Sequence, residues 1–397
     1  MFRNILSIRS LSITAAIGSL TILSLIAGCS GMSTSSGNSS SGMMSSTPTV
    51  LSQLTTKTTI GSTVDPTNGD NNPYGLAIAP ATSGLINAGD LIVCNFNDKA
   101  GTSGAGTTIE DLAPTANSTP KRIAQDPSLA GCDALALGST DAIWAAAYTA
   151  NDNPIVKPTG TVATTLATSF NWQQPWGQIF AVPSMSSGIT ANPTFYVSQA
   201  GNGSIVAVEI TSTGFVYKTI ATGFPTAVSA TYGILAPAGL TYDPNTDTLY
   251  IVSSDTNSVV AISKVSTVPE NGITVSSSTS SGSGGSYGSG SGSGSGSSTL
   301  TFSGPAASQA KVIASGSPLN YPVSSALLYN GDLIVGNTGD NNMVEINPAT
   351  DAVIGTTSVD GGKAGAIFGI ATEGTTLATQ KVFFNDDNTN TVVELSQ

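Results

Sequence analysis

Short apolar runs separated by Gly, Asn, Asp and Pro recur along most of the chain. The clearest series is 322–357, PVSSALLYNGDLIVGNTGDNNMVEINPATDAVIGTT. Runs of about 4–6 residues rich in Val, Ile and Leu and bounded by turn residues are typical of β-strands. The series therefore predicts consecutive strands at 325–328, 332–335, 342–346 and 352–357. A meander of this size cannot bury both of its faces alone, so it needs similar units to pack against.

Similar units occur along the chain, and each starts with a related first strand. Most continue with a second apolar strand and then an Asn/Asp-rich loop. The units predict an all-β, six-bladed β-propeller, with seven blades as the alternative because the second and third units depart most from the pattern. The six entries are PYGL (73–76), GCDA (131–134), PWGQ (175–178), APAG (236–239), PVSS (322–325) and IFGI (367–370).

The last unit is incomplete and predicts how the ring closes. Residues 368–395 supply only three apolar runs, whereas 53–60 (QLTTKTTI) has strand composition and belongs to no unit. An unpaired edge strand is a liability in a sheet. We therefore expect 53–60 to pair as the outermost strand of the last blade.

Several repeat segments resemble a known class of propeller repeat. The segments PYGLAIAP (73–80), LTYDPNTDTLYIV (240–252) and VEINPATDAVIG (344–355) are similar to NHL-type and YVTN-type repeats. The resemblance covers most of 70–397 and implies a β-propeller. Its motifs are structural and imply little about function.

The N-terminal segment predicts export and lipid attachment. Arg3 and Arg9 precede an apolar stretch at 13–27, which is typical of a signal peptide. Residues 25–29, LIAGC, resemble the lipobox of bacterial lipoproteins. The resemblance implies a signal peptide over 1–29, acyl chains on Cys29 and a lipid-anchored place in the cell envelope. Ser30, rather than Asp, favours the outer membrane or cell surface over the inner membrane.

Two segments of low complexity shape the expected domain organisation. Residues 30–49 are Ser/Gly-rich and predict a flexible, disordered tether between the lipid and a propeller at 50–397. The Gly/Ser tract at 275–299 predicts an exposed loop of the fourth blade, between strands at 259–263 and 311–314. We expect that loop on the face opposite the entry turns.

Composition narrows the chemistry that the chain can perform. Charged residues make up only 9% of the chain, the formal net charge is −12, and there is no histidine. A Ser-His-Asp triad and imidazole metal ligands are therefore excluded. An acidic chain without a run of Lys and Arg has no cluster of positive charge to neutralise phosphates, so nucleic acid is not an expected partner. No catalytic constellation is visible, and we predict a protein that is not an enzyme.

Aromatic residues at the blade entries are the first candidate site. Beside polar neighbours they would ring one mouth of the channel and suit a neutral ligand, a glycan or a loop of a partner protein. The alternative is that they pack between blades. The candidates are Tyr74, Trp176, Tyr232, Tyr321 and Phe368, with Trp172 beside them.

The Asn/Asp loops and the cysteines are the other candidates. The loops suit Asx turns and left-handed backbone. The alternative is that their oxygen atoms bind Ca²⁺, with Asp340, Asp386 and Asp387 as the candidate ligands; no other cofactor is expected. Cys94 and Cys132 lie in adjacent predicted blades and form either a disulfide or buried thiols.

The leading functional prediction is a surface-tethered lipoprotein whose propeller is a non-enzymatic scaffold that binds a ligand or a protein. The alternative is a calcium-dependent hydrolase that is similar to gluconolactonase. Antibiotic-lyase propellers rely on histidine, which this chain lacks.

Overall fold

The computed structural model describes residues 48–229, 233–279 and 298–397. The predicted signal peptide with Cys29, nearly all of the tether, Tyr232 and most of the Gly/Ser tract lie outside the described residues. Within the described part of the chain, no helix is long and apolar enough to cross a membrane.

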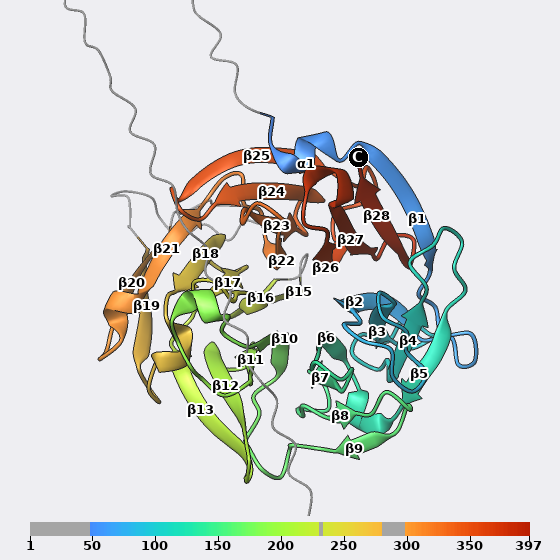
Figure 1. Cartoon of the computed structure of the whole chain (residues 1–397), viewed down its shortest axis with the longest axis horizontal. Coiled ribbons are helices and arrows are strands. Elements are labelled where there is room, and N and C mark those ends of the chain that lie inside the picture. Colours follow the sequence, from blue (N-terminus) through green and yellow to red (C-terminus); the bar gives the residue numbers. More distant parts are fainter. Residues whose placement is uncertain (1–47, 230–232, 280–297) are drawn as a thin grey trace, which may run out of the picture. The chain divides into compact units, whose positions relative to one another are not determined.

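Six antiparallel blades surround a central axis, which confirms the six-bladed β-propeller (Figure 1). Blades one to three comprise β2 (Asn71–Ile78), β3 (Leu91–Asn97), β4 (Thr108–Leu112), β5 (Lys121–Gln125); β6 (Cys132–Leu137), β7 (Ile143–Ala147), β8 (Ile155–Val156), β9 (Val162–Thr164); β10 (Pro175–Ala181), β11 (Thr194–Gln199), β12 (Ser204–Thr211) and β13 (Gly214–Thr222).

Blades four to six follow the same order from the axis outwards. They comprise β16 (Pro237–Asp243), β17 (Thr248–Ser253), β18 (Ser258–Ile262), β21 (Ala310–Ser315); β22 (Pro322–Leu327), β23 (Leu333–Asn337), β24 (Asn342–Asn347), β25 (Ala352–Ser358); β26 (Ile367–Glu373), β27 (Lys381–Asp386), β28 (Thr391–Ser396) and β1 (Thr56–Ser62).

Short elements complete the described chain. A small hairpin precedes blade four, and single helical turns lie in the connections. These elements are β14 (Ala227–Ser229), β15 (Gly233–Leu235), α1 (Val50–Gln53), η1 (Pro127–Leu129), η2 (Met185–Ser187), η3 (Val265–Thr267), η4 (Ala307–Gln309) and η5 (Leu377–Thr379).

Strand β1 closes the ring as the sequence predicts. It pairs antiparallel with β28, so that Thr58 lies opposite Glu394, and it is the outermost strand of blade six. The predicted segment began at 53, but residues up to Gln53 form α1 instead. This turn is held because the backbone N–H groups of Val50 and Leu51 donate to the Glu345 carboxylate at 3.0 and 2.8 Å. Helix N-terminal N–H groups lack partners within the helix, and Glu345 satisfies two of them.

The Gly/Ser segment differs from its prediction at both ends. Strands β19 (Ile273–Thr279) and β20 (Ser298–Ser303) form a hairpin that extends the sheet of blade three beside β13. Val275 and Leu300 are buried in the core, because apolar residues alternate with Ser and Thr at the ends of the tract. Residues 275–279 and 298–299 therefore belong to strands rather than to the predicted loop, and 280–297 lie outside the described residues.

Strand β19 ends on the face of the propeller that carries the entry turns of the blades, whereas the sequence predicted the Gly/Ser tract on the opposite face. Strand β19 runs parallel to β13, with Ala221 opposite Ile273 and Thr222 opposite Thr274. The C-terminal end of β13 leads toward the entry of blade four, and β19 continues in the same direction to Thr279. The sequence could not show this, because it gives no sign that the insertion pairs with the preceding blade.

Asparagines in left-handed backbone join neighbouring blades. Each lies in a loop between second and third strands, and its side-chain oxygen accepts a backbone N–H from the entry of the next blade. Left-handed φ is tolerated by Asn more readily than by most residues. The pairs are Asn151 with Gln174, Asn257 with Tyr321, Asn341 with Gly365 and Ala366, and Asn390 with Asn72.

Candidate functional site

Every first strand contains a register shift near its start. A β-bulge re-aims the side chain of the extra residue, and five of these residues line the narrow end of the axial channel, one each from blades one, two, three, five and six. The shifted segments contain Tyr74, Asp133, Trp176, Ala238, Val323 and Phe368.

Small residues after the bulges keep the channel narrow. A Cβ atom on Gly177 would lie 1.9 Å from the Ala238 carbonyl oxygen, and one on Gly369 would lie 2.6 Å from the Tyr74 carbonyl oxygen. Adjacent first strands therefore approach each other as closely as backbone allows. The entries PWGQ and IFGI carry these glycines for packing.

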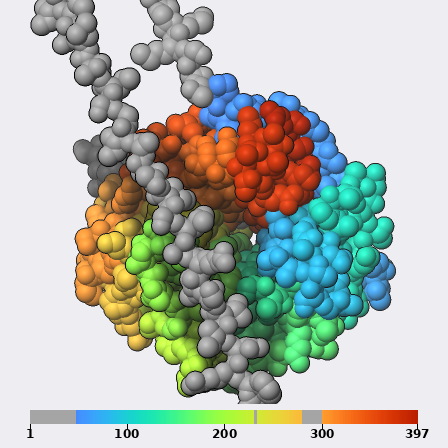
Figure 2. Space-filling view, viewed as in Figure 1, coloured from blue at the N-terminus to red at the C-terminus, as the bar shows by residue number. Residues whose placement is uncertain are grey.

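The channel has a narrow end, a waist and a wide end. The narrow cavity has a volume of about 70 Å³ and the wide one about 400 Å³. The blades enclose a small central opening (Figure 2). Residues that line both cavities form the waist: Leu76, Leu135, Gln178, Leu240, Ser325 and Ile370. The wide end is lined mainly by apolar groups, among them Ile78, Leu137, Phe180, Tyr242 and Leu327.

Three of the predicted aromatic residues meet at the narrow end. The Tyr74 ring stacks on Phe368 with centroids 3.7 Å apart and on Phe96 with centroids 4.4 Å apart. Trp176 lies 6.3 Å from Tyr74 and meets Tyr148 edge-on at 5.6 Å. Because two rings stack on Tyr74, both of its faces are covered. Aromatic groups fill the entry-turn end, and the larger free volume is at the other end.

The remaining aromatic candidates lie elsewhere. Trp172 is only 1% exposed and packs with Phe170 and Tyr217 in the core of blades two and three. Tyr321 is half-buried, has a φ of 49° and does not line the narrow cavity. Tyr232 lies outside the described residues. Ligand binding by any of these residues stays a prediction.

Sequence reasoning missed Asp133, Phe96 and Tyr148. Asp133 is 7% exposed and lines the narrow cavity, and neither of its carboxylate oxygens has a hydrogen-bond partner among the described residues. Burial raises the pKa of Asp133 well above its ordinary value. The only available signal was an acidic residue where three other blade entries have Tyr, Trp or Phe.

The predicted metal ligands come from two different blades. Asp340 is exposed and accepts the N–H of Asn342 in its own loop, whereas Asp386 and Asp387 lie in blade six. Burial and the neighbouring Asp386 charge raise the pKa of Asp387 to about 7. Among the described residues, no group of three or more His, Cys, Asp or Glu side chains could hold a metal ion.

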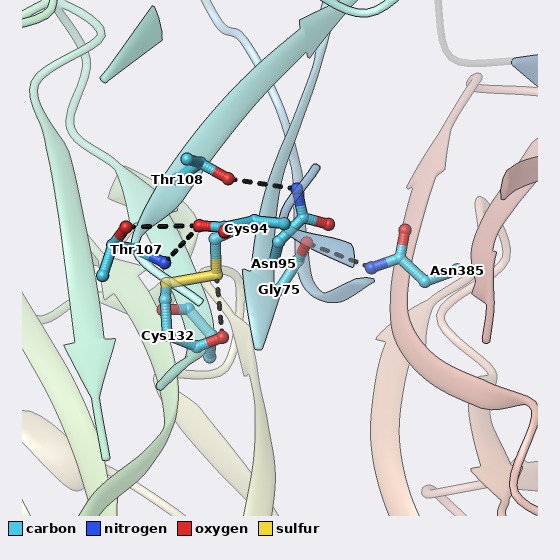
Figure 3. The surroundings of a disulfide bond; sticks show 9 residues. Gly75, Cys94, Asn95, Thr107, Thr108, Cys132 and Asn385 are labelled. Carbon is cyan, nitrogen blue, oxygen red and sulfur yellow. Dashed lines mark hydrogen bonds between the residues drawn. A yellow bond between two sulfur atoms is a disulfide. The ribbon is translucent and has the colours of Figure 1, made fainter. Parts of the chain in front are cut away.

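The two cysteines of the propeller are bonded to each other. Their disulfide connects Cys94 in β3 of blade one to Cys132 in β6 of blade two (Figure 3). Asp133 follows Cys132 directly in the sequence. On the other side of blade one, the Asn385 amide donates to the Gly75 carbonyl at 3.0 Å and joins blade six to blade one. Blade one is thus joined to both of its neighbouring blades.

No protein-family model matches the sequence, and no curated protein matches it. Among solved structures, a gluconolactonase from Xanthomonas campestris matches with a TM-score of 0.52 at 9% identity, over 82% of this chain and 86% of that one. The calcium-binding protein regucalcin from Agrobacterium tumefaciens gives 0.50 at 13% identity, over 85% and 93%. These likenesses show the fold alone. Virginiamycin B lyase from Staphylococcus aureus gives 0.49 at 14% identity, over 86% and 98%.

Proposed function

We propose that this protein is an envelope lipoprotein whose propeller binds an amphipathic ligand in its axial channel without transforming it. Acyl chains on Cys29 anchor it to the outer membrane or cell surface. The resemblance of 25–29 to a lipobox supports the anchor.

The binding proposal rests on the lining of the channel, which is mainly apolar in the wide cavity and includes a carboxyl group in the narrow one. The wide cavity of about 400 Å³ is lined mainly by aliphatic and aromatic side chains. Past the waist, the narrow cavity presents the unpaired Asp133 carboxyl group among aromatic rings. Ligand pockets are commonly apolar with a few polar groups that fix orientation. An apolar ligand body in the wide end and a polar head at Asp133 match this lining.

The binding proposal is tested with n-hexanol as a probe and a variant that blocks the waist. Ser325→Phe places a ring where the two cavities meet, and Val353→Phe adds the same ring on the exposed face of β25 as a matched control. We expect calorimetry to detect hexanol binding to the wild type and to Val353→Phe, and at least tenfold weaker binding to Ser325→Phe.

Equal hexanol binding by both variants would place the probe outside the channel and contradict the proposal. Calcium-dependent hydrolysis of a gluconolactone by the purified protein would instead support the hydrolase alternative. For the anchor, we expect Cys29→Ala to abolish incorporation of labelled palmitate; retained label would refute lipidation at Cys29.

A further inference from the structure

We propose that the narrow end of the channel recognises a cationic amine head group through Asp133, so that the ligand is an amphipathic amine. This inference rests on the proposed function and names the chemical class of the ligand.

Asp133 is a buried acceptor that the described chain does not satisfy. The bulge between Cys132 and Ala134 lies at this residue, which lines the narrow cavity and is 7% exposed. None of the ion pairs formed by the described residues includes it. A buried carboxylate without a partner is costly, whereas a bound cation would supply both charge and hydrogen-bond donors.

The surrounding rings suit a cation as well. Tyr74 and Trp176 belong to the two blades that flank Asp133 and line the same cavity. Tyr148 also lies near Asp133, because the Asp133 charge contributes to raising the pKa of Tyr148 after burial. Both faces of Tyr74 are covered by Phe96 and Phe368, whereas among the described residues no ring stacks on Trp176 or Tyr148. Aromatic faces carry negative electrostatic potential and attract ammonium groups. A carboxylate flanked by such rings therefore favours an amine over an alcohol or an acid.

Two further polar groups face the same cavity without partners. The Ser324 hydroxyl oxygen, from blade five, has no hydrogen-bond partner in the part of the chain that the structure describes, and it can accept from an ammonium group. The Gln178 Nε2 is also unpartnered, while its Oε1 accepts from the Asn153 amide. Rotating both amides keeps the bond between Gln178 and Asn153 and leaves the Gln178 oxygen free.

The volume fits a head group rather than a whole ligand. The narrow cavity, about 70 Å³, accommodates more than a single water molecule. The adjoining wide cavity, about 400 Å³, receives an alkyl or ring system. The amine would enter through the wide end, since aromatic rings fill the entry-turn end.

The test compares n-hexylamine, n-hexanol and n-hexanoate by calorimetry at pH 7 with the full chain. We expect hexylamine to bind about tenfold or more tightly than hexanol, and hexanoate most weakly, as a desolvated charge pair requires. In Asp133→Asn, which keeps the shape, we expect amine and alcohol to bind within about twofold of each other. The exposed Asp340→Asn is the matched control and should keep the amine preference.

The outcomes separate the two proposals. If hexanol binds the wild type as tightly as hexylamine, the amine inference is wrong and channel binding stands. If none of the three probes binds, the proposed function itself is wrong. An amine preference that persists in a folded Asp133→Asn protein would show that another group recognises the cation. Ser324→Ala provides an independent variant, which we expect to weaken hexylamine binding more than hexanol binding and so to reduce the amine preference.

Discussion

Glu110, in the third strand of blade one, shows how a single buried carboxyl group responds to its surroundings. The residue has no exposed surface, and burial together with the neighbouring Asp65 carboxylate raises its pKa to about 9. Although burial opposes it, hydrogen bonding from Arg122 lowers the pKa of Asp65, and the two residues form an ion pair at 2.5 Å. Glu110 is therefore neutral while Asp65 is charged at neutral pH.

Glu110→Gln should remove a pH dependence of stability. The pKa of Glu110 in the folded state, about 9, lies above the ordinary value of 4.5. The contribution of protonated Glu110 to the free energy of unfolding is therefore complete below about pH 4.5 and is lost as the pH rises toward 9. We expect the variant to gain at least about 1 kcal/mol over the wild type at pH 9 and nothing at pH 4, measured by urea unfolding.

The control for this prediction is Glu270→Gln, because Glu270 is exposed. Its stability should follow the wild type across the whole pH range. Wild-type and Glu110→Gln curves that remained parallel from pH 4 to 9 would show that Glu110 does not titrate as its burial requires.

At the scale of elements, β1 and the turn before it decide whether the ring is closed. Strand β1 covers the edge of β28, and Leu51, in the turn before it, is 1% exposed. The two hydrogen bonds to Glu345 join this turn to blade five, so one short segment joins the last two blades. Local unfolding of the segment would expose a strand edge.

Glu345→Ala should weaken this closure. The substitution leaves two N–H groups of α1 without their acceptor, and we expect a loss of about 1–3 kcal/mol in the free energy of unfolding. Hydrogen exchange of the β1 amides should accelerate more than that of β17, which lies in blade four. A uniform acceleration would indicate global destabilisation instead. Deleting 50–62 should have a larger effect of the same kind.

At the scale of the molecule, the bond between Cys94 and Cys132 holds blades one and two together. It closes a separation of 38 residues in the sequence. Loop-entropy arguments for intervals of this size give stabilisation of about 2–4 kcal/mol. The disulfide and the β1–β28 pairing thus secure the two junctions nearest the point where the ring closes.

Replacing both cysteines by serine should lower the free energy of unfolding by about 2–4 kcal/mol. Reductant should destabilise the wild type by a similar amount and leave the double variant unchanged in a thermal melt. If two thiols of the propeller titrate in denatured wild-type protein before any reduction, the bond is absent in solution.

Much of the fold was predictable because its determinants are local. Apolar runs and turn residues at 322–357 predicted four strands that match β22 to β25, with the first beginning three residues earlier than expected. The unpaired edge of the last unit predicted the pairing of β1 with β28. Each strand is recognised from the alternation of apolar and polar residues within a short segment and from the turn residues at its ends. The number of strands in each unit then follows by counting these segments.

The site was not predictable in the same way. Which residues face the axis depends on bulges that shift the first strands, and a bulge appears only when two strands are paired. The sequence thus determined the six blades, their closing strand and the aromatic entries. Only the tertiary structure decided that Tyr74, Trp176 and Phe368 line one narrow cavity together with a buried Asp133, because long-range strand packing sets which side chains converge on the axis.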